Sequence, residues 1–135
     1  MPKAGAIARP LAVIMSRELR TISPDATLAD AATLMRSAAV GALLVREREE
    51  YVGIVTEPDL IRKAMAVGLD PRVERVRRIM SSPVITIGIE RSAHDASDVM
   101  AEHGIRHLAI TEDARIVGII SVRDLLRYFK NWGAM

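Results

Sequence analysis

Two short stretches of the sequence place a hydroxyl and a carboxylate where they could hold a small ligand. Thr56 is followed three residues later by Asp59, and Ser121 is followed in the same way by Asp124. The hydroxyl suits the N-cap of a helix, where unpaired backbone N–H groups attract phosphate. An Asp would repel phosphate, so its natural ligand there is a vicinal diol, such as the one on a ribose. The spacing therefore predicts two places that could hold a phosphorylated nucleoside.

The same spacing also has a purely structural interpretation. A hydroxyl at the N-cap with an acid three residues later forms a capping box, in which both side chains bond to the helix backbone. Most capping boxes bind nothing else. Gly53 and Gly118, which precede the two pairs, favour the ligand, because a missing side chain leaves room for close approach. Spacing alone leaves both interpretations open.

The two stretches belong to an internal repeat. Residues 14–63 align with residues 79–128 without a gap, at a constant offset of 65, and 16 of the 50 positions are identical. Val52-Gly53-Ile54 recurs as Val117-Gly118-Ile119 in this alignment. A match of this length indicates that the chain consists of two copies of one structural unit.

Each copy has the pattern strand, helix, strand, strand, helix. In the first copy, we expect strands over 21–23, 41–45 and 51–55 and helices over 25–37 and 57–67, the second helix closed by Gly68. In the second copy, which runs from 86 to 130, the helices are expected over 92–103 and 122–129. Short apolar helices or turns precede the copies over 11–16 and 76–81. These patterns predict a mixed α/β (α+β) fold.

The segment between the copies is rich in arginine. Four arginines within seven residues alternate with apolar side chains: Arg72, Arg75, Arg77 and Arg78. Such a segment could bind nucleic acid, but no aromatic residue is interleaved to stack on bases. We favour a linker helix with one apolar side on the body of the protein and a solvated basic side.

Composition excludes several classes of function. Of 135 residues, half are apolar and only 3% are aromatic, and the net charge is +2, which demands no polyanionic partner. The chain has no cysteine, so it has no disulfides and no thiolate chemistry. No apolar run is long enough for a membrane span, and the N-terminal stretch lacks an apolar signal core. We therefore expect a cytoplasmic protein without membrane contact.

The residues that could support catalysis or metal binding do not form a convincing set. His103 and His107 are four residues apart, but Gly104 should end the helix between them, so they should not share a metal. Ser121, Asp124 and His107 are the residue types of a catalytic triad, yet no nucleophile elbow surrounds the serine. We expect no metal site and no catalytic residues, and hence no enzyme.

Taken together, these features resemble a pair of cystathionine β-synthase (CBS) domains, also called a Bateman module. The resemblance covers residues 11–130. Its motifs are Thr21-Ile22-Ser23-Pro24 with Thr86-Ile87, Gly104-Ile105-Arg106-His107-Leu108, and the two Gly-x-x-(Ser/Thr)-x-x-Asp stretches. It implies a lead-in over 1–10, a first repeat over 11–69, a linker helix with the second repeat over 70–130, and a tail over 131–135. In this family the two repeats pack through their sheets about a pseudo-twofold axis.

The resemblance also implies two ligand clefts, each formed by both repeats. By position, the first cleft takes Thr56, Asp59, Thr86, Ile87, Gly88, Ile105, Arg106 and His107. The second takes Thr21, Ile22, Ser23, Val40, Gly41, Ala42, Ser121, Arg123 and Asp124. In such clefts the Asp holds the ribose hydroxyls, the strand after the Thr contacts adenine, and the hydroxyl residue and nearby cations meet phosphate. We favour the first cleft, because Arg106 offers a planar donor fork with His107 beside it.

By the same resemblance, the protein is a non-catalytic sensor module that requires no cofactor and binds an adenine nucleotide. AMP is the foremost candidate, followed by ADP, ATP or another adenosyl ligand. A homodimer is expected through the apolar helices, together with a separate effector protein. Two alternatives remain: a ligand-free structural or interaction module, and a nucleic-acid binder through the segment from Arg72 to Arg78.

Overall fold

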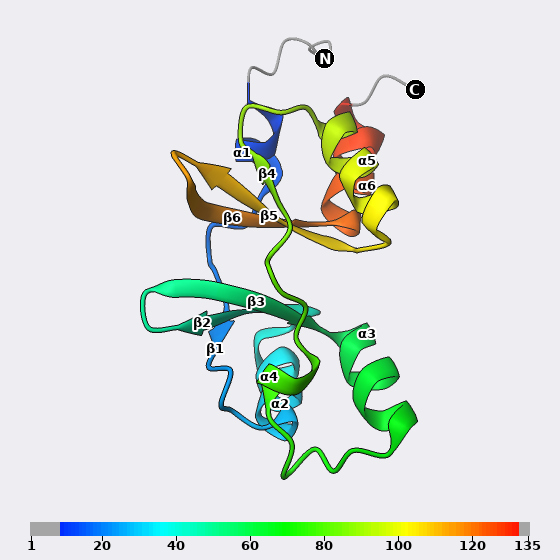
Figure 1. Ribbon diagram of the computed structural model, residues 1–135. Helices are drawn as coiled ribbons and strands as arrows, with labels where there is room; N and C mark the ends of the chain where they lie inside the picture. Colours follow the sequence, from blue (N-terminus) through cyan, green and yellow to red (C-terminus); the bar gives the residue numbers. More distant parts are fainter. Residues whose placement is uncertain (1–8, 133–135) are drawn as a thin grey trace. The chain divides into compact units, whose positions relative to one another are not determined.

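The computed structural model describes residues 9–132, which form two compact units (Figure 1). The first-repeat unit is Arg20–Val84, and the second-repeat unit combines residues 9–19 with residues 85–132. The short helix ahead of each copy therefore packs with the other copy, so the units do not follow the expected boundary between residues 69 and 70. Most of the expected lead-in and tail lies outside the described residues.

The first-repeat unit contains one three-stranded sheet and its helices. Its elements are β1 (Thr21–Ile22), α2 (Leu28–Ala38), β2 (Ala42–Glu47), β3 (Glu50–Thr56), α3 (Glu57–Asp59) and α4 (Val76–Ile79). The sheet has the order β1-β2-β3, with β1 parallel to β2 and β2 antiparallel to β3. The parallel pair needs a crossover, and α2 supplies it.

The second-repeat unit repeats this topology. Its elements are α1 (Pro10–Ile14), β4 (Thr86–Gly88), α5 (Ala93–His103), β5 (His107–Glu112), β6 (Arg115–Ser121) and α6 (Val122–Trp132). The sheet order is β4-β5-β6, again with one parallel and one antiparallel pair. The predicted pattern of strand, helix, strand, strand, helix is confirmed for both copies, and so is the mixed α+β class.

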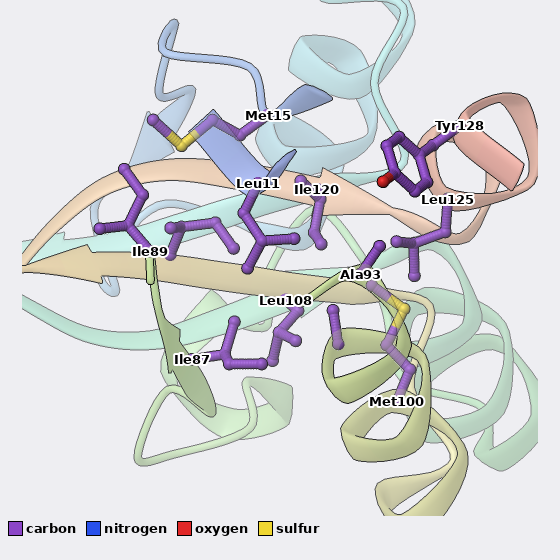
Figure 2. Packing of buried hydrophobic residues seen from close by; sticks show 12 residues of the cluster. Leu11, Met15, Ile87, Ile89, Ala93, Met100, Leu108, Ile120, Leu125 and Tyr128 are labelled. Atoms are coloured by element: carbon purple, nitrogen blue, oxygen red, sulfur yellow. The ribbon is translucent and has the colours of Figure 1, made fainter. Parts of the chain in front are cut away.

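Each unit has its own apolar core, and the short preceding helix is part of it. In the second-repeat unit, Leu11 of α1 lies in one cluster with Leu108 and Ile120 from the sheet (Figure 2). In the first-repeat unit, Val76 and Ile79 of α4 are buried with Leu43 of β2. Burial of these aliphatic side chains explains why the segments around α1 and α4 are ordered at all.

Gly53 and Gly118 allow the chain to pack closely on itself. Ser81 exchanges backbone hydrogen bonds of 2.9 and 3.0 Å with Ile54, and Ser16 forms the equivalent bonds with Ile119 at 2.9 and 3.0 Å. A Cβ on Gly53 would lie 2.7 Å from the carbonyl oxygen of Ser81, and one on Gly118 would collide with the side chain of Met15. The expectation that these glycines leave room for a ligand is therefore wrong, because the segments after α4 and α1 occupy that space.

The predicted helix over 57–67 is not a single α-helix. After α3 it continues as a π-helical turn, Leu60–Ala64, and a 3-10 turn, Met65–Val67, and Gly68 ends it with a φ of +78°. Met65 in the 3-10 turn is 77% exposed and so lies outside the core. In the second copy, the equivalent segment is the regular α-helix α6, so the irregular turns are found in the first copy alone among the described residues.

The predicted linker helix is also shorter than expected. Only Val76–Ile79 is helical, while the Asp70 carbonyl accepts the N–H groups of Val73 and Glu74 in a turn. Arg75 explains the difference, because its backbone is extended and forms an antiparallel bridge with Thr27. No helix within residues 9–132 combines the length and the apolar character needed to cross a bilayer.

Candidate functional site

The two sequence-predicted hydroxyl and acid pairs form capping boxes. The Thr56 N–H donates to Asp59 Oδ2 at 3.0 Å, and the Asp59 N–H donates to Thr56 Oγ1 at 3.3 Å. The Ser121 N–H donates to Asp124 Oδ2 at 2.8 Å, and the Asp124 N–H donates to Ser121 Oγ at 3.2 Å. The capping interpretation is thus confirmed for both pairs.

The same box begins two further helices. Thr27 and Asp30 cap α2, and Ser92 and Asp95 cap α5, each with both reciprocal hydrogen bonds. Neither of these acids belongs to the sequence-predicted site. At Asp30 and Asp95, as at Asp124, the acid accepts its bond in the box through Oδ2. A capping box therefore does not by itself distinguish a ligand site, and the contacts of each acid beyond the box have to be compared.

The contacts beyond the box differ between the two candidate acids. Asp59 Oδ1 lies 3.1 Å from the ammonium of Lys63, in an ion pair one helical turn apart. In Asp124, Oδ2 accepts the Ser121 N–H and also the Ser121 hydroxyl at 3.0 Å, so both bonds from Ser121 fall on one oxygen. Sequence reasoning missed Lys63, although its spacing of four from Asp59 is the usual signal of a helical ion pair.

Backbone donors at the two helix starts differ as well. At α3, the Glu57 N–H donates to the Gly41 carbonyl at 3.0 Å, and Pro58 has no N–H at all. At α6, the Val122 N–H donates to the Arg106 carbonyl at 2.9 Å, but Arg123 keeps an N–H at a position where a helix supplies no acceptor. An anion could therefore find a backbone donor at α6 more readily than at α3.

In the first-repeat unit, several expected lining residues lie near Thr56. Ala42 pairs with Thr56 across the sheet, and Gly41 accepts the hydrogen bond from the first residue of α3. Val40 packs against the core. On the next strand, Thr21 and Ile22 pair with residues of β2, and the Ser23 hydroxyl accepts the Asp25 N–H at 3.1 Å.

In the second-repeat unit, His107 pairs with Ser121, and the exposed Arg106 directly precedes it. Ile87 is only 5% exposed and Ile105 packs against the same core, so Ile87 can offer a ligand its backbone but not its side chain. Thr86 and Gly88 flank Ile87 and pair with residues of β5. The register thus brings Arg106 and His107 beside the start of α6 in their own repeat. The two expected clefts combine residues of both units and stay predictions.

The arginines of the linker have partners within the protein. Arg77 donates to Glu47 at 2.5 Å and to Asp25 at 3.3 Å, and Arg78 pairs with Glu74 at 2.8 Å. The two others are bound as well, Arg72 to Asp70 and Arg75 to the Asp25 carbonyl. The hydrogen bond from Arg77 lowers the pKa of Glu47 below its ordinary value near 4.5. These contacts weigh against nucleic-acid binding, which would require arginines that are free to meet phosphates.

The histidines lie as the sequence predicts. His103 is in the last turn of α5, where its Nδ1 is 2.9 Å from the Val99 carbonyl oxygen, and Gly104 ends the helix before His107 begins β5. Within residues 9–132, no group of three or more His, Asp or Glu side chains could hold a metal ion.

The family model of the CBS domain matches the chain twice, over residues 11–66 and over residues 76–131. The chain belongs to the CBS-domain family. Its two CBS domains make it a CBS pair, as in a Bateman module. The two family matches begin with α1 and α4, so they follow the sequence copies, whereas the compact units exchange these helices.

This CBS pair is similar to proteins of several organisms. An uncharacterized protein of Methanopyrus kandleri is 35% identical over 116 residues, which cover 84% of this chain but only 59% of that protein. A candidate signal-transduction protein with CBS domains from Burkholderia ambifaria MC40-6 has 29% identity, a TM-score of 0.86 and 96% coverage of both chains. A hexameric CBS-CP12 protein from bloom-forming cyanobacteria has 35% identity and a TM-score of 0.80, over 87% of this chain and 67% of that one.

Proposed function

We propose that this CBS pair is a non-catalytic regulatory module that binds an adenine nucleotide, with AMP as the foremost candidate. One observation carries the proposal: Asp124 caps α6 through Oδ2, so the cap does not use its Oδ1, and the exposed Arg123 lies one residue away. A carboxylate oxygen has two lone pairs, so Oδ1 can accept both hydroxyls of a ribose while the helix cap stays intact.

The same reasoning moves our preference from the Asp59 cleft to the Asp124 cleft. Asp59 has both carboxylate oxygens engaged, one by the Thr56 N–H and one by Lys63. Asp124 also has the Arg123 side chain, which is exposed, one residue away. A nucleotide bound at Asp124 would therefore meet an acceptor oxygen that the cap does not use and a cation for its phosphate.

Calorimetric titration of the chain with AMP, ADP, ATP, NAD and S-adenosylmethionine tests the proposal. We expect saturable heat with at least one of these adenosyl ligands, and the tightest of them identifies the class of phosphate chain that the site accepts. If none of the five gives heat or raises the unfolding temperature, the chain is not an adenine-nucleotide sensor.

A ligand-free structural or interaction module is the second candidate. The capping boxes at α2 and α5 favour it, because in them an Asp at the same position of the helix caps a helix that belongs to no predicted ligand site. The two candidates differ in what replacement of Asp124 does: a loss of helix stability alone supports the structural module, and a loss of nucleotide binding supports the sensor.

We also propose that the module associates with a second copy and signals to a separate effector protein. The cyanobacterial neighbour is hexameric, which supports self-association in proteins of this kind. In this chain, Ile61 and Leu126 occupy equivalent positions of the two copies and are 57% and 64% exposed. Two equivalent exposed aliphatic side chains are typical of a surface that another protein covers.

A further inference from the structure

Lys63 joins the acid of the first repeat to the segment after α4. Its ammonium lies 3.1 Å from Asp59 Oδ1 and donates to the Ile79 carbonyl at 3.2 Å and to the Ser81 hydroxyl at 3.2 Å. An ammonium has three hydrogens, so these three acceptors use its full capacity. The Asp59 side chain is only 12% exposed, whereas that of Lys63 is 45% exposed. A ligand that binds Asp59 Oδ1 therefore has to compete with the Lys63 ammonium, which two further hydrogen bonds hold in place.

The second repeat has a different residue at this position. The position equivalent to Lys63 is Tyr128, which is 5% exposed and belongs to the apolar core. The helices also differ, since Lys63 lies in the π-helical turn Leu60–Ala64 and Tyr128 lies in the regular helix α6. Short π-helical turns often occur where a helix has a local function. Lys63 is thus a feature of one repeat and not of the shared fold.

We infer that Lys63 is a specificity-determining residue, which blocks Asp59 as a ribose acceptor and so makes Asp124 the acid that binds the first nucleotide. This inference rests on the proposed nucleotide binding. A ribose hydroxyl that approached Asp59 would have to share or displace the ammonium at Oδ1, and displacement would also break the two bonds from Lys63 to Ile79 and Ser81. At Asp124, the residue one helical turn later is the buried Tyr128 and not a lysine. The two acids are therefore unequal before any ligand arrives.

Titration of the full chain with AMP tests the inference through four variants. Each chain has two candidate acids, so a second nucleotide can bind after the first. We expect Lys63→Met to raise the affinity for this second nucleotide about tenfold or more above that of the unmodified chain. The double variant Lys63→Met with Asp59→Ala should lose this gain, and Lys63→Arg, which keeps the cation, should not show it. Lys130→Met is the matched control, because it removes an exposed lysine on α6 that is remote from Asp59 in the sequence.

The outcomes separate the inference from the proposed function. If the unmodified chain binds AMP and Lys63→Met binds it with the same stoichiometry and affinity, the inference is wrong and the nucleotide sensor stands. If Lys63→Met weakens the first binding event, Lys63 is itself a ligand contact and the inference is again wrong. If no variant binds AMP or another adenosyl ligand, both are wrong. Lys63→Tyr, which introduces the residue found in the second repeat, gives the same readout should the Met variant fold poorly.

Discussion

Four helices of this chain begin with the same two side chains, a hydroxyl at the N-cap and an Asp at the third helical position. The acids do not have equal surroundings beyond the cap. At Asp95, the pKa lies below its ordinary value of 3.8, first because of a hydrogen bond from Arg91. At Asp59 the second oxygen meets Lys63, and at Asp124 the Ser121 hydroxyl bonds to the capping oxygen as well. The contacts beyond the cap, and not the cap itself, therefore distinguish these acids.

Replacement of the acids by Asn separates capping from ligand binding. Asp124→Asn and Asp30→Asn should each cost about 0.5–1 kcal/mol of unfolding free energy, because Asn lacks the charge that favours a helix N-terminus. Only Asp124→Asn should also weaken nucleotide binding, about ten- to a thousandfold, through the loss of charge-assisted hydrogen bonds. Urea unfolding and calorimetric titration of the two variants measure both effects. Equal and small effects on nucleotide affinity would mean that capping is the whole role of Asp124.

At the scale of the elements, the segments after α1 and α4 extend each sheet by one bridging pair. The repeat and the order of elements could be predicted, because periodicity and turn residues report local structure. The exchange of α1 and α4 between the copies could not be predicted. The apolar pattern of residues 11–16 shows that this segment packs against a core, but it does not show which of the two cores. The sequence also suggested that Gly53 leaves space for a ligand. A glycine indicates that another group packs closely against the backbone, but the sequence does not show that this group is the chain itself.

The close packing at the two glycines can be tested by comparing the loss of stability in Gly53→Ala with that in Gly118→Ala. The added Cβ at Gly53 would meet the backbone oxygen of Ser81, which cannot move without the bridging segment, so we expect a cost of about 1–3 kcal/mol. The added Cβ at Gly118 would meet the flexible side chain of Met15, and the cost should be smaller. Chemical unfolding of the two variants gives the comparison. A larger loss for Gly118→Ala would show that the bridging segment after α4 is not held rigidly.

The ion pair between Arg77 and Glu47 gives the linker a dependence on pH. Because the folded state lowers the pKa of Glu47 below about 4.5, the pair stabilises the protein above that pH and stops doing so as the pH falls through the folded-state value. The stability difference between the unmodified chain and Arg77→Met should therefore be constant near neutral pH and shrink below pH 4.5.

Urea midpoints measured from pH 7 to pH 3 check this dependence, with Arg36→Met as the control. Arg36 is an exposed arginine in the last turn of α2. A stability difference for Arg77→Met that stays constant down to pH 3 would rule out the contribution of Glu47.

At the scale of the whole molecule, exposed aliphatic side chains indicate association. Ile61, Met65 and Leu126 are 57%, 77% and 64% exposed on the second helices of the two copies. We expect light scattering to give twice the chain mass of 14.8 kDa at micromolar concentration. Ile61→Asp combined with Leu126→Asp should return the mass of one chain.

Val13→Asp is the matched control for the double variant. Val13 is 65% exposed, but it lies on α1 and not on the second helix of either copy. It should leave the dimer intact. A mass near 14.8 kDa for the unmodified chain would contradict the proposed dimer.

The central claim is that Asp124 binds the ribose of an adenine nucleotide, and an NMR titration with AMP tests it most directly. Two equivalent boxes on one chain provide the comparison: Ser121 with Asp124 at α6, and Ser92 with Asp95 at α5. We predict that the amide signals of Ser121, Arg123 and Asp124 shift with saturation as AMP is added, while those of Ser92 and Asp95 stay in place. Unchanged signals at Ser121 and Asp124 under saturating AMP would contradict the account.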